Sequence, residues 1–105
     1  MVRGEIYLVN LDPTIGSEIQ KTRPCVIVSP PEIHNHLRTA LIAPMTTGSR
    51  PAPFRIPVEF QGKQGLILPE QIRVIDKARL AKSLGHLEEK TLQQLLIVLQ
   101  DMFTE

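Results

Sequence analysis

The hydrophobic periodicity changes once along this chain, and that change constrains the fold more than any other feature of the sequence. Up to about residue 76 the apolar residues form short runs or alternate with polar ones, which is typical of β-strands. Near the C-terminus they recur instead at the three- and four-residue spacing of one helical face. This order predicts a mainly β protein, in which a small twisted sheet or open barrel of five or six short strands has one C-terminal helix packed against it.

The strands are predicted from short apolar runs bounded by turn residues and prolines. They are expected at residues 4–11, 25–29, 38–45 and 54–60, with two further short pieces within 65–76 that are separated at Pro69. In the fourth run the apolar positions are Phe54, Ile56, Val58 and Phe60. Pro57 has no backbone N–H to donate, so we expect this run at a sheet edge or at a β-bulge.

The helix is predicted over residues 88–103. Its apolar face would be formed by Leu92, Leu95, Leu96, Leu99, Met102 and Phe103. Glu88 and Glu89 fall in its first turn, where the helix dipole favours negative charge. Earlier in the chain, Ile72, Val74 and Ile75 are further core candidates.

Composition and charge place the chain among ordinary globular domains. With 42% hydrophobic and 22% charged residues, we expect one domain over residues 1–105. No apolar run approaches the roughly 20 residues of a membrane span and no signal peptide is visible, so we expect a cytoplasmic protein. Cys25 is the single cysteine and is predicted to be a small core residue. The net charge of +1 predicts no nucleic-acid binding by itself, although residues 73–82 are locally basic and 83–105 acidic.

A long polar loop precedes the second predicted strand, although compact domains usually join strands in a handful of residues. It contains Glu18 and Arg23, with hydroxyl groups at Thr14, Ser17 and Thr22, a combination suited to binding phosphate. Arg23 directly precedes Pro24, whose fixed φ also restricts its neighbour, so the guanidinium is presented from a stiff point. The alternative is a solvated ion pair between Glu18 and Arg23, worth well under about 1 kcal/mol.

Two further segments carry compatible side chains. MTTGSR places Thr46 and Thr47 beside a glycine turn, and PEQIR contains Glu70 and Arg73. We expect the three loops to line one groove that holds positive charge, hydroxyl donors and carboxylates. His34 and His36 invite a metal interpretation, but histidines two apart point to widely separated faces of a helix, and no metal site or cofactor is predicted.

Taken in order, five segments of the chain resemble the MazF/PemK family of toxin endoribonucleases. They are RGEIYLVNLDPTIGSE, TRPCVIVSP, APMTT, PEQIRVID and SLGHLEEKTLQQL, which together cover nearly the whole sequence. The resemblance implies a small SH3-like barrel with a C-terminal helix, working as a homodimer that cuts single-stranded RNA without a metal. It also implies a partner antitoxin whose acidic disordered segment occupies the RNA groove, and binding to operator DNA only together with that antitoxin.

The resemblance assigns catalytic roles to Arg23, Thr46 and Glu18. Some PemK-like members have a histidine where Ser17 stands and an aspartate where Glu70 stands, so the general base stays open between Glu18 and Glu70. A guanidinium gives up its proton reluctantly near neutral pH, so Arg23 is expected to stabilise charge first. The RNA-binding candidates are Thr14, Ser17, Lys21, Thr47, Arg50, Glu70, Gln71 and Arg73.

Two other functions are compatible with the same fold. The related CcdB toxins use this barrel to poison DNA gyrase without cutting anything, and fold alone does not decide function. A degenerate member that only binds RNA or an antitoxin would fit the departures at Ser17 and Glu70. Arg23, Thr46 and the RP motif favour the endoribonuclease, because a gyrase-binding surface would not require them.

Overall fold

The structure is a computed structural model that describes residues 1–13, 15–18 and 21–105. Within these residues the chain forms seven strands: β1 (Glu5–Asn10), β2 (Thr22–Ile27), β3 (Thr39–Thr46), β4 (Ile56–Phe60), β5 (Lys63–Ile67), β6 (Arg73–Asp76) and β7 (Leu80–His86). The helices are α1 (Pro31–His34) and α2 (Glu89–Met102), and the short 3-10 turns are η1 (Pro69–Gln71) and η2 (Lys77–Arg79). Neither α-helix in these ranges is long and apolar enough to cross a membrane.

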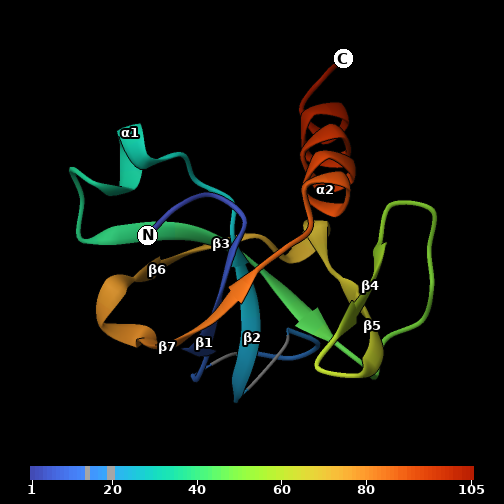
Figure 1. Cartoon of the computed structure of the whole chain (residues 1–105), viewed down its shortest axis with the longest axis horizontal. Helices are drawn as coiled ribbons and strands as arrows, with labels where there is room; N and C mark the ends of the chain where they lie inside the picture. Colours follow the sequence, from blue (N-terminus) through green and yellow to red (C-terminus); the bar gives the residue numbers. More distant parts are fainter. Residues whose placement is uncertain (14, 19–20) are drawn as a thin grey trace.

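The strands form one curled antiparallel sheet that stays open, with α2 standing against it (Figure 1). The strand order is β4-β5-β3-β2-β1-β7, and β6 pairs with β3 beside this path. The long strand β3 is therefore shared by β2, β5 and β6. This architecture confirms the predicted open barrel with a C-terminal helix. Because β4 lies at one end of the strand order, the edge position expected for Pro57 is confirmed as well.

Hydrophobic side chains pack against both faces of β2, as expected because the sequence of that strand is apolar on both faces. Val26 lies in a cluster between the sheet and α2, whose other buried members include Ile6, Ala43, Ile67, Leu92 and Leu95. Cys25 and Ile27 point to the opposite face and lie in a second cluster with Val9, Leu11, Ile42 and Ile75. Packing on both faces fixes β2, and with it the position of the residues that begin the strand.

The sequence predicts five or six strands, whereas the described residues form seven, so this prediction is wrong. The strand that was not predicted is β7. Its sequence, LAKSLGH, contains lysine, serine and glycine, and most of its residues are exposed. The strand can be this polar because it lies at the other end of the sheet, where it pairs with β1 and is interrupted by register shifts. An edge strand of this kind carries little hydrophobic periodicity from which to predict it.

Several apolar residues predicted to be buried are exposed. Val74 is 62% exposed, because β6 alternates its side chains and turns Ile75 inward instead. Phe54 precedes β4 and is 42% exposed. Met102 and Phe103 are also exposed, because the end of α2 projects beyond the sheet (Figure 1).

His34 is a buried structural residue. Its Nε2 lies 2.9 Å from the carbonyl oxygen of Met1 and its Nδ1 lies 2.9 Å from Ser29 Oγ. A carbonyl oxygen can only accept, so Nε2 donates to Met1, and the Ser29 hydroxyl donates to Nδ1 while accepting from the backbone N–H of Leu41. His34 therefore ties the N-terminus to the segment after β2.

Candidate functional site

Arg23 and Thr46 lie on neighbouring strands at the end of the paired region of β2 and β3. Cys25 pairs with Pro44 in this antiparallel register, so continuing the register by two residues places Arg23 opposite Thr46. Thr46 also pairs with Leu66 of β5, which makes it the point where β3 passes from one neighbour to the other. The sheet opens here into a cavity of about 190 Å³.

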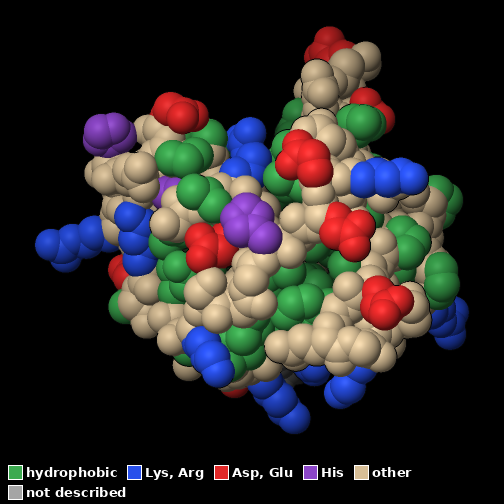
Figure 2. All heavy atoms as spheres, viewed as in Figure 1, with side chains coloured by type: hydrophobic (Ala, Val, Ile, Leu, Met, Phe, Trp, Pro, Cys, Tyr) green, Lys and Arg blue, Asp and Glu red, His purple; other side chains and the backbone are tan. Residues whose placement is uncertain are grey.

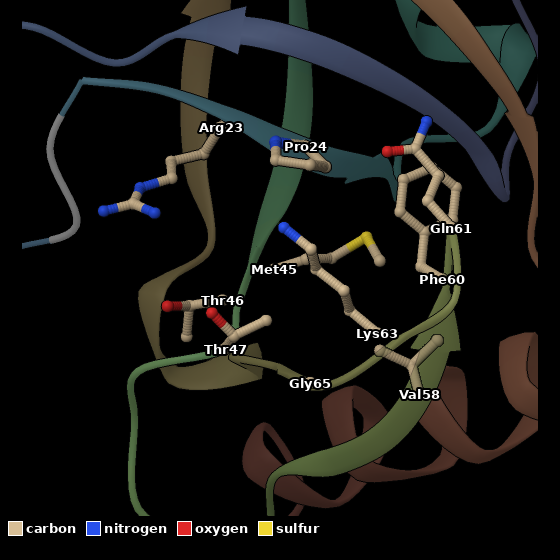
Figure 3. Close-up of a pocket in the computed structure, with 10 residues that line it drawn as sticks. All are labelled: Arg23, Pro24, Met45, Thr46, Thr47, Val58, Phe60, Gln61, Lys63 and Gly65. Atoms are coloured by element: carbon tan, nitrogen blue, oxygen red, sulfur yellow. The ribbon is translucent and has the colours of Figure 1, made fainter.

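This cavity, called the arginine cavity below, brings together Arg23, Thr46 and Thr47 (Figure 3). The guanidinium of Arg23 and the two threonine hydroxyls lie on the same side of it, and the amino group of Lys63 points into its middle. The remaining wall is formed by Pro24, Met45, Val58, Phe60, Gln61 and Gly65. Two cations, two hydroxyls and an apolar wall in one cavity suit a ligand that combines a phosphate with a flat base.

Lys63 is a site residue that the sequence reasoning missed. It begins β5 directly after the tight Gln61-Gly62 turn, in which both residues have positive φ angles, 52° and 76°. That turn folds β5 back along β4 and so directs Lys63 toward Arg23, from which it is distant in the sequence. The available signal was the glycine turn in QGKQG, which predicts a hairpin but not the strand that the hairpin faces.

The geometry around Thr46 depends on close backbone packing. Thr46 Oγ1 accepts a hydrogen bond of 3.1 Å from the backbone N–H of Gly48, so its own hydrogen can point into the cavity. On the other side Gly65 approaches so closely that a Cβ atom at that position would lie 2.8 Å from the carbonyl oxygen of Thr46. Thr46 is thus held between a turn and a neighbouring strand.

Glu18 does not line the arginine cavity. It lines a second cavity, also of about 190 Å³, together with Glu70, Gln71 and Arg73, here called the carboxylate cavity. Pro44 lines this cavity while its neighbour Met45 lines the other, so the two hollows lie beside the same strand, β3. The single groove expected from the three loops is therefore divided in the structure into two neighbouring cavities.

Both carboxylates of the second cavity have identified partners. Glu18 Oε1 accepts a 3.0 Å hydrogen bond from the backbone N–H of Ile15 within its own loop. Glu70 Oε2 lies 2.6 Å from Arg55 Nη2 and 3.1 Å from Arg55 Nε, which forms a two-point ion pair. Arg55 also donates to the carbonyl of Arg50 at 2.8 Å, so it fastens the loop between β3 and β4 to η1.

The other predicted site residues occupy the rims of these cavities or the loops beside them. Ser17 and Arg50 are exposed in the loops that follow β1 and β3. Lys21 is exposed, with a positive φ of 66°, at the end of the first of these loops. Thr14 lies outside the described residues. Within the described ranges, no three histidine, cysteine, aspartate or glutamate side chains are grouped so that they could hold a metal ion.

Charge is distributed unevenly over the surface. Figure 2 shows lysine and arginine side chains along the edge of the molecule opposite α2, and acidic side chains over α2 and the neighbouring surface.

The fold and the cavities together define a class of protein, a small open β-barrel with a C-terminal helix and a cationic, hydroxyl-bearing cavity where its strands diverge.

The chain belongs to the family of PemK-like, MazF-like toxins of type II toxin-antitoxin systems, whose family model matches residues 2–103. It is 38% identical over 110 residues to the endoribonuclease PemK of Escherichia coli, with 99% of this chain and 83% of that protein covered. It is 35% identical over 91 residues to the endoribonuclease toxin MazF of Escherichia coli K12, with 86% and 82% covered.

Solved structures show the same fold at lower sequence identity. The crystal structure of MazF from Deinococcus radiodurans superposes with a TM-score of 0.86 at 22% identity, covering 97% of this chain and 94% of that one. An endoribonuclease from a mycobacterial species, solved in complex with its cognate antitoxin, gives a TM-score of 0.80 at 20% identity, with 96% and 92% covered. The family and fold inferred from the sequence motifs are therefore confirmed.

Proposed function

We propose that this chain is an endoribonuclease toxin that cleaves single-stranded RNA in the cytoplasm, without a metal ion. The observation that carries the proposal is the arginine cavity, where Arg23 and Thr46 meet in a member of a toxin family whose relatives are named endoribonucleases. Thr47, Lys63 and the carboxylate cavity surround this pair with further groups able to contact RNA.

The reaction we propose uses the RNA's own 2′-hydroxyl as the nucleophile. Its oxygen forms a bond to the adjacent phosphorus while the bond from phosphorus to the 5′-oxygen breaks, which leaves a 2′,3′-cyclic phosphate and a 5′-hydroxyl. The 2′ proton passes to a general base, and the departing 5′-oxygen takes a proton from an acid or from water. DNA lacks the nucleophile and is not cleaved.

Arg23 and Thr46 act on the charge that develops on the phosphoryl oxygens. Arg23 supplies a fixed cation at the start of a strand that is packed on both faces. Thr46 donates its hydroxyl hydrogen to a phosphoryl oxygen, since its oxygen already accepts from Gly48. For the general base we favour Glu18 over Glu70, because Glu18 accepts a hydrogen bond from a neutral backbone N–H, whereas the carboxylate of Glu70 is held in an ion pair with Arg55.

The test is primer extension on a long RNA incubated with the purified protein in EDTA. We expect cleavage at defined sites, and a loss of about a hundred- to a thousandfold in rate for Arg23→Ala. Arg38→Ala removes an exposed arginine that lines neither cavity and precedes β3 at the end opposite Thr46, so it serves as the matched control with an unchanged rate. Equal cleavage by a correctly folded Arg23→Ala variant, or cleavage of a DNA of the same sequence, would refute the proposal.

The partners we propose follow from charge and size. An antitoxin with an acidic disordered segment would place its carboxylates against Arg23 and Lys63, in competition with RNA, and operator DNA would be bound only by that complex.

A second copy of the chain is proposed to cover the apolar hollow of about 300 Å³ beside α1, whose rim includes Ile33, Leu37 and Val74.

A further inference from the structure

The loop between β1 and β2 begins and ends where the pairing of the strands stops, and residues 10–12 and 21–22 are here called its root. The register pairs Asn10 with Thr22, the first residue of β2, and the pairing of β1 with β7 stops one residue earlier, at Val9 and Leu80. Around this point the carbonyl groups of Asn10, Leu11 and Asp12 accept hydrogen bonds from side chains. The hydrogen bond to the carbonyl of Leu11 is partly buried, where a carbonyl without a donor would destabilise the fold, whereas those to the carbonyls of Asn10 and Asp12 are exposed.

Two arginines that are distant in the sequence supply these donors. Arg79 Nη1 donates to the carbonyl of Asn10 at 3.1 Å and also to the carbonyl of Asp12. Arg73 Nη1 donates to the carbonyl between them, that of Leu11, at 3.3 Å. Three successive carbonyls are therefore held by two guanidinium groups, and a charged donor makes each such bond stronger than one between neutral groups.

Two further hydrogen bonds join the beginning of this loop to its end. The backbone N–H of Leu11 donates to the carbonyl of Lys21 at 2.9 Å, and the backbone N–H of Lys21 donates to Asp12 Oδ1 at 2.8 Å. Asp12 thus joins the clamp to the far end of the loop, because its carbonyl binds Arg79 while its carboxylate binds Lys21. Arg23 follows Lys21 by only two residues, and Glu18 lies within the loop.

Arg79 is itself firmly mounted. It ends η2, a turn in which Asp76 Oδ1 accepts the backbone N–H of Ala78 at 2.8 Å. The turn is fixed to the sheet by a 2.7 Å hydrogen bond from the backbone N–H of Lys77 to the carbonyl of Arg38. Among the described residues, Arg79 lines neither the arginine cavity nor the carboxylate cavity.

We propose that Arg79 is a positioning residue for RNA cleavage. It fixes the root of the loop through the carbonyls of Asn10 and Asp12, and so holds Glu18 and Arg23 in the arrangement that the reaction needs. It acts without touching the RNA. This role rests on the proposed endoribonuclease activity, but the clamp itself is a property of the folded chain that can be measured without RNA.

The experiment compares wild type with Arg79→Ala and Arg79→Lys, and uses Lys82→Ala as the control that removes one positive charge from exposed β7. Amide hydrogen exchange is measured at Leu11 and Lys21, with Val26 in the core as an internal reference for global stability. Single-turnover cleavage and the salt dependence of RNA affinity are measured in parallel. Arg79→Lys keeps the charge but has a shorter side chain with a single ammonium head, so it should not reach both carbonyls.

For Arg79→Ala we expect at least tenfold faster exchange at Leu11 and Lys21 with little change at Val26. The single-turnover rate should fall by about ten- to a hundredfold, the effect of a small misplacement of catalytic groups. The slope of log affinity against log salt should stay at the wild-type value, since no phosphate contact is lost. Arg79→Lys should resemble Arg79→Ala, and Lys82→Ala should resemble wild type in exchange and rate.

Three results would overturn the proposal. One is unchanged exchange at Leu11 and Lys21 in Arg79→Ala; another is acceleration that is equal at Val26, which would show a general loss of stability. The third is a salt slope reduced by about one with full activity restored by Arg79→Lys, which would make Arg79 a phosphate contact. If wild type cleaves no RNA, the proposed function fails, whereas the exchange measurements still decide whether Arg79 holds the loop.

Discussion

At the scale of single residues, the candidate site depends on one place where two backbones nearly touch. Gly65 of β5 packs against the carbonyl of Thr46, and an added Cβ would lie 2.8 Å from that oxygen, closer than side-chain carbons normally come. The obstacle is backbone, which cannot rotate away as a side chain would. The absence of a side chain at Gly65 therefore allows β5 to pack against the backbone of Thr46, whose hydroxyl lies in the cavity with Arg23.

Gly65→Ala should therefore push β5 away from Thr46. We expect a loss of stability of about 1 to 3 kcal/mol, typical of overpacking, and at least a tenfold loss in RNA cleavage rate. The matched control is Gly48→Ala, since a Cβ there would lie 3.8 Å from Thr46 Oγ1, an ordinary contact. Urea denaturation and single-turnover cleavage measure the two effects, and equal behaviour of the two variants would contradict this account.

The thiol of Cys25 gives a prediction about pH. Burial raises its pKa to about 12, and the charge of Arg73 opposes the shift only in part. An unfolded chain has a thiol pKa of about 8.5, so the native state keeps a proton that the unfolded state loses. The stabilising effect is complete below about pH 8.5 and is lost as the pH rises toward 12.

We therefore expect the free energy of unfolding to fall more steeply between pH 8 and pH 10 in wild type than in Cys25→Ala, by up to about 2 kcal/mol. Urea titrations at the two pH values measure the difference. The same burial predicts that Cys25 reacts with a thiol reagent at pH 8 only when denaturant is added. Parallel pH dependence in both proteins, or rapid labelling of the native state, would show that the thiol is accessible.

At the scale of elements, the sequence predicts the strands and the helix that bury apolar side chains on one face or on both. The strands near residues 25–29 and 38–45 and the C-terminal helix are confirmed, because each buries a regular set of positions. β7 could not be predicted in this way, since it contributes little to the core. The exposure of Val74 likewise depends on how β6 pairs with β3, which periodicity does not reveal.

The residues of the candidate site likewise fall into those that the sequence could predict and those that it could not. The meeting of Arg23 and Thr46 could be anticipated because consecutive antiparallel strands bring their ends together. Lys63, Arg55 and Arg79 could not, since each reaches its partner across the curled sheet from a distant part of the chain. The separation of Glu18 from the arginine cavity is also a tertiary effect, because it depends on which side of β3 the loop lies.

The helix α2 offers a direct test at this scale. Leu95 is completely buried against the sheet, whereas Ile97 on the same helix is 56% exposed. Leu95→Ala should lower the free energy of unfolding by about 2 to 5 kcal/mol, because it leaves a cavity in the core. Ile97→Ala should change it by no more than about 0.5 kcal/mol. Urea denaturation distinguishes the two, and similar losses would mean that α2 is not packed as described.

At the scale of the whole molecule, polar and apolar side chains line hollows in different parts of the surface. The strand ends around Arg23 and Glu18 hold the charged and hydroxyl groups in two cavities beside β3. The hollow beside α1 is lined mainly by apolar side chains, among them Val28, Leu37 and Val74. The polar cavities and this apolar surface involve different ends of the long strand β3, so the RNA and the second copy that we propose would occupy different surfaces.

This arrangement leads to a prediction about assembly. Val74 is 62% exposed, Ile33 51% and Leu37 50%, and all three surround one hollow. If a second copy covers this surface, Val74→Lys places charges inside the interface and should convert a dimer into a monomer, because an unpaired charge is costly to bury. Ile97→Lys is the matched control, since it adds the same charge at an exposed aliphatic position on α2 and should leave the dimer intact. Sedimentation equilibrium of wild type and both variants gives the masses directly, and thermal melting checks that each variant is folded. A monomeric wild type, or a Val74→Lys variant that stays dimeric, would show that copies of this chain do not associate through this surface.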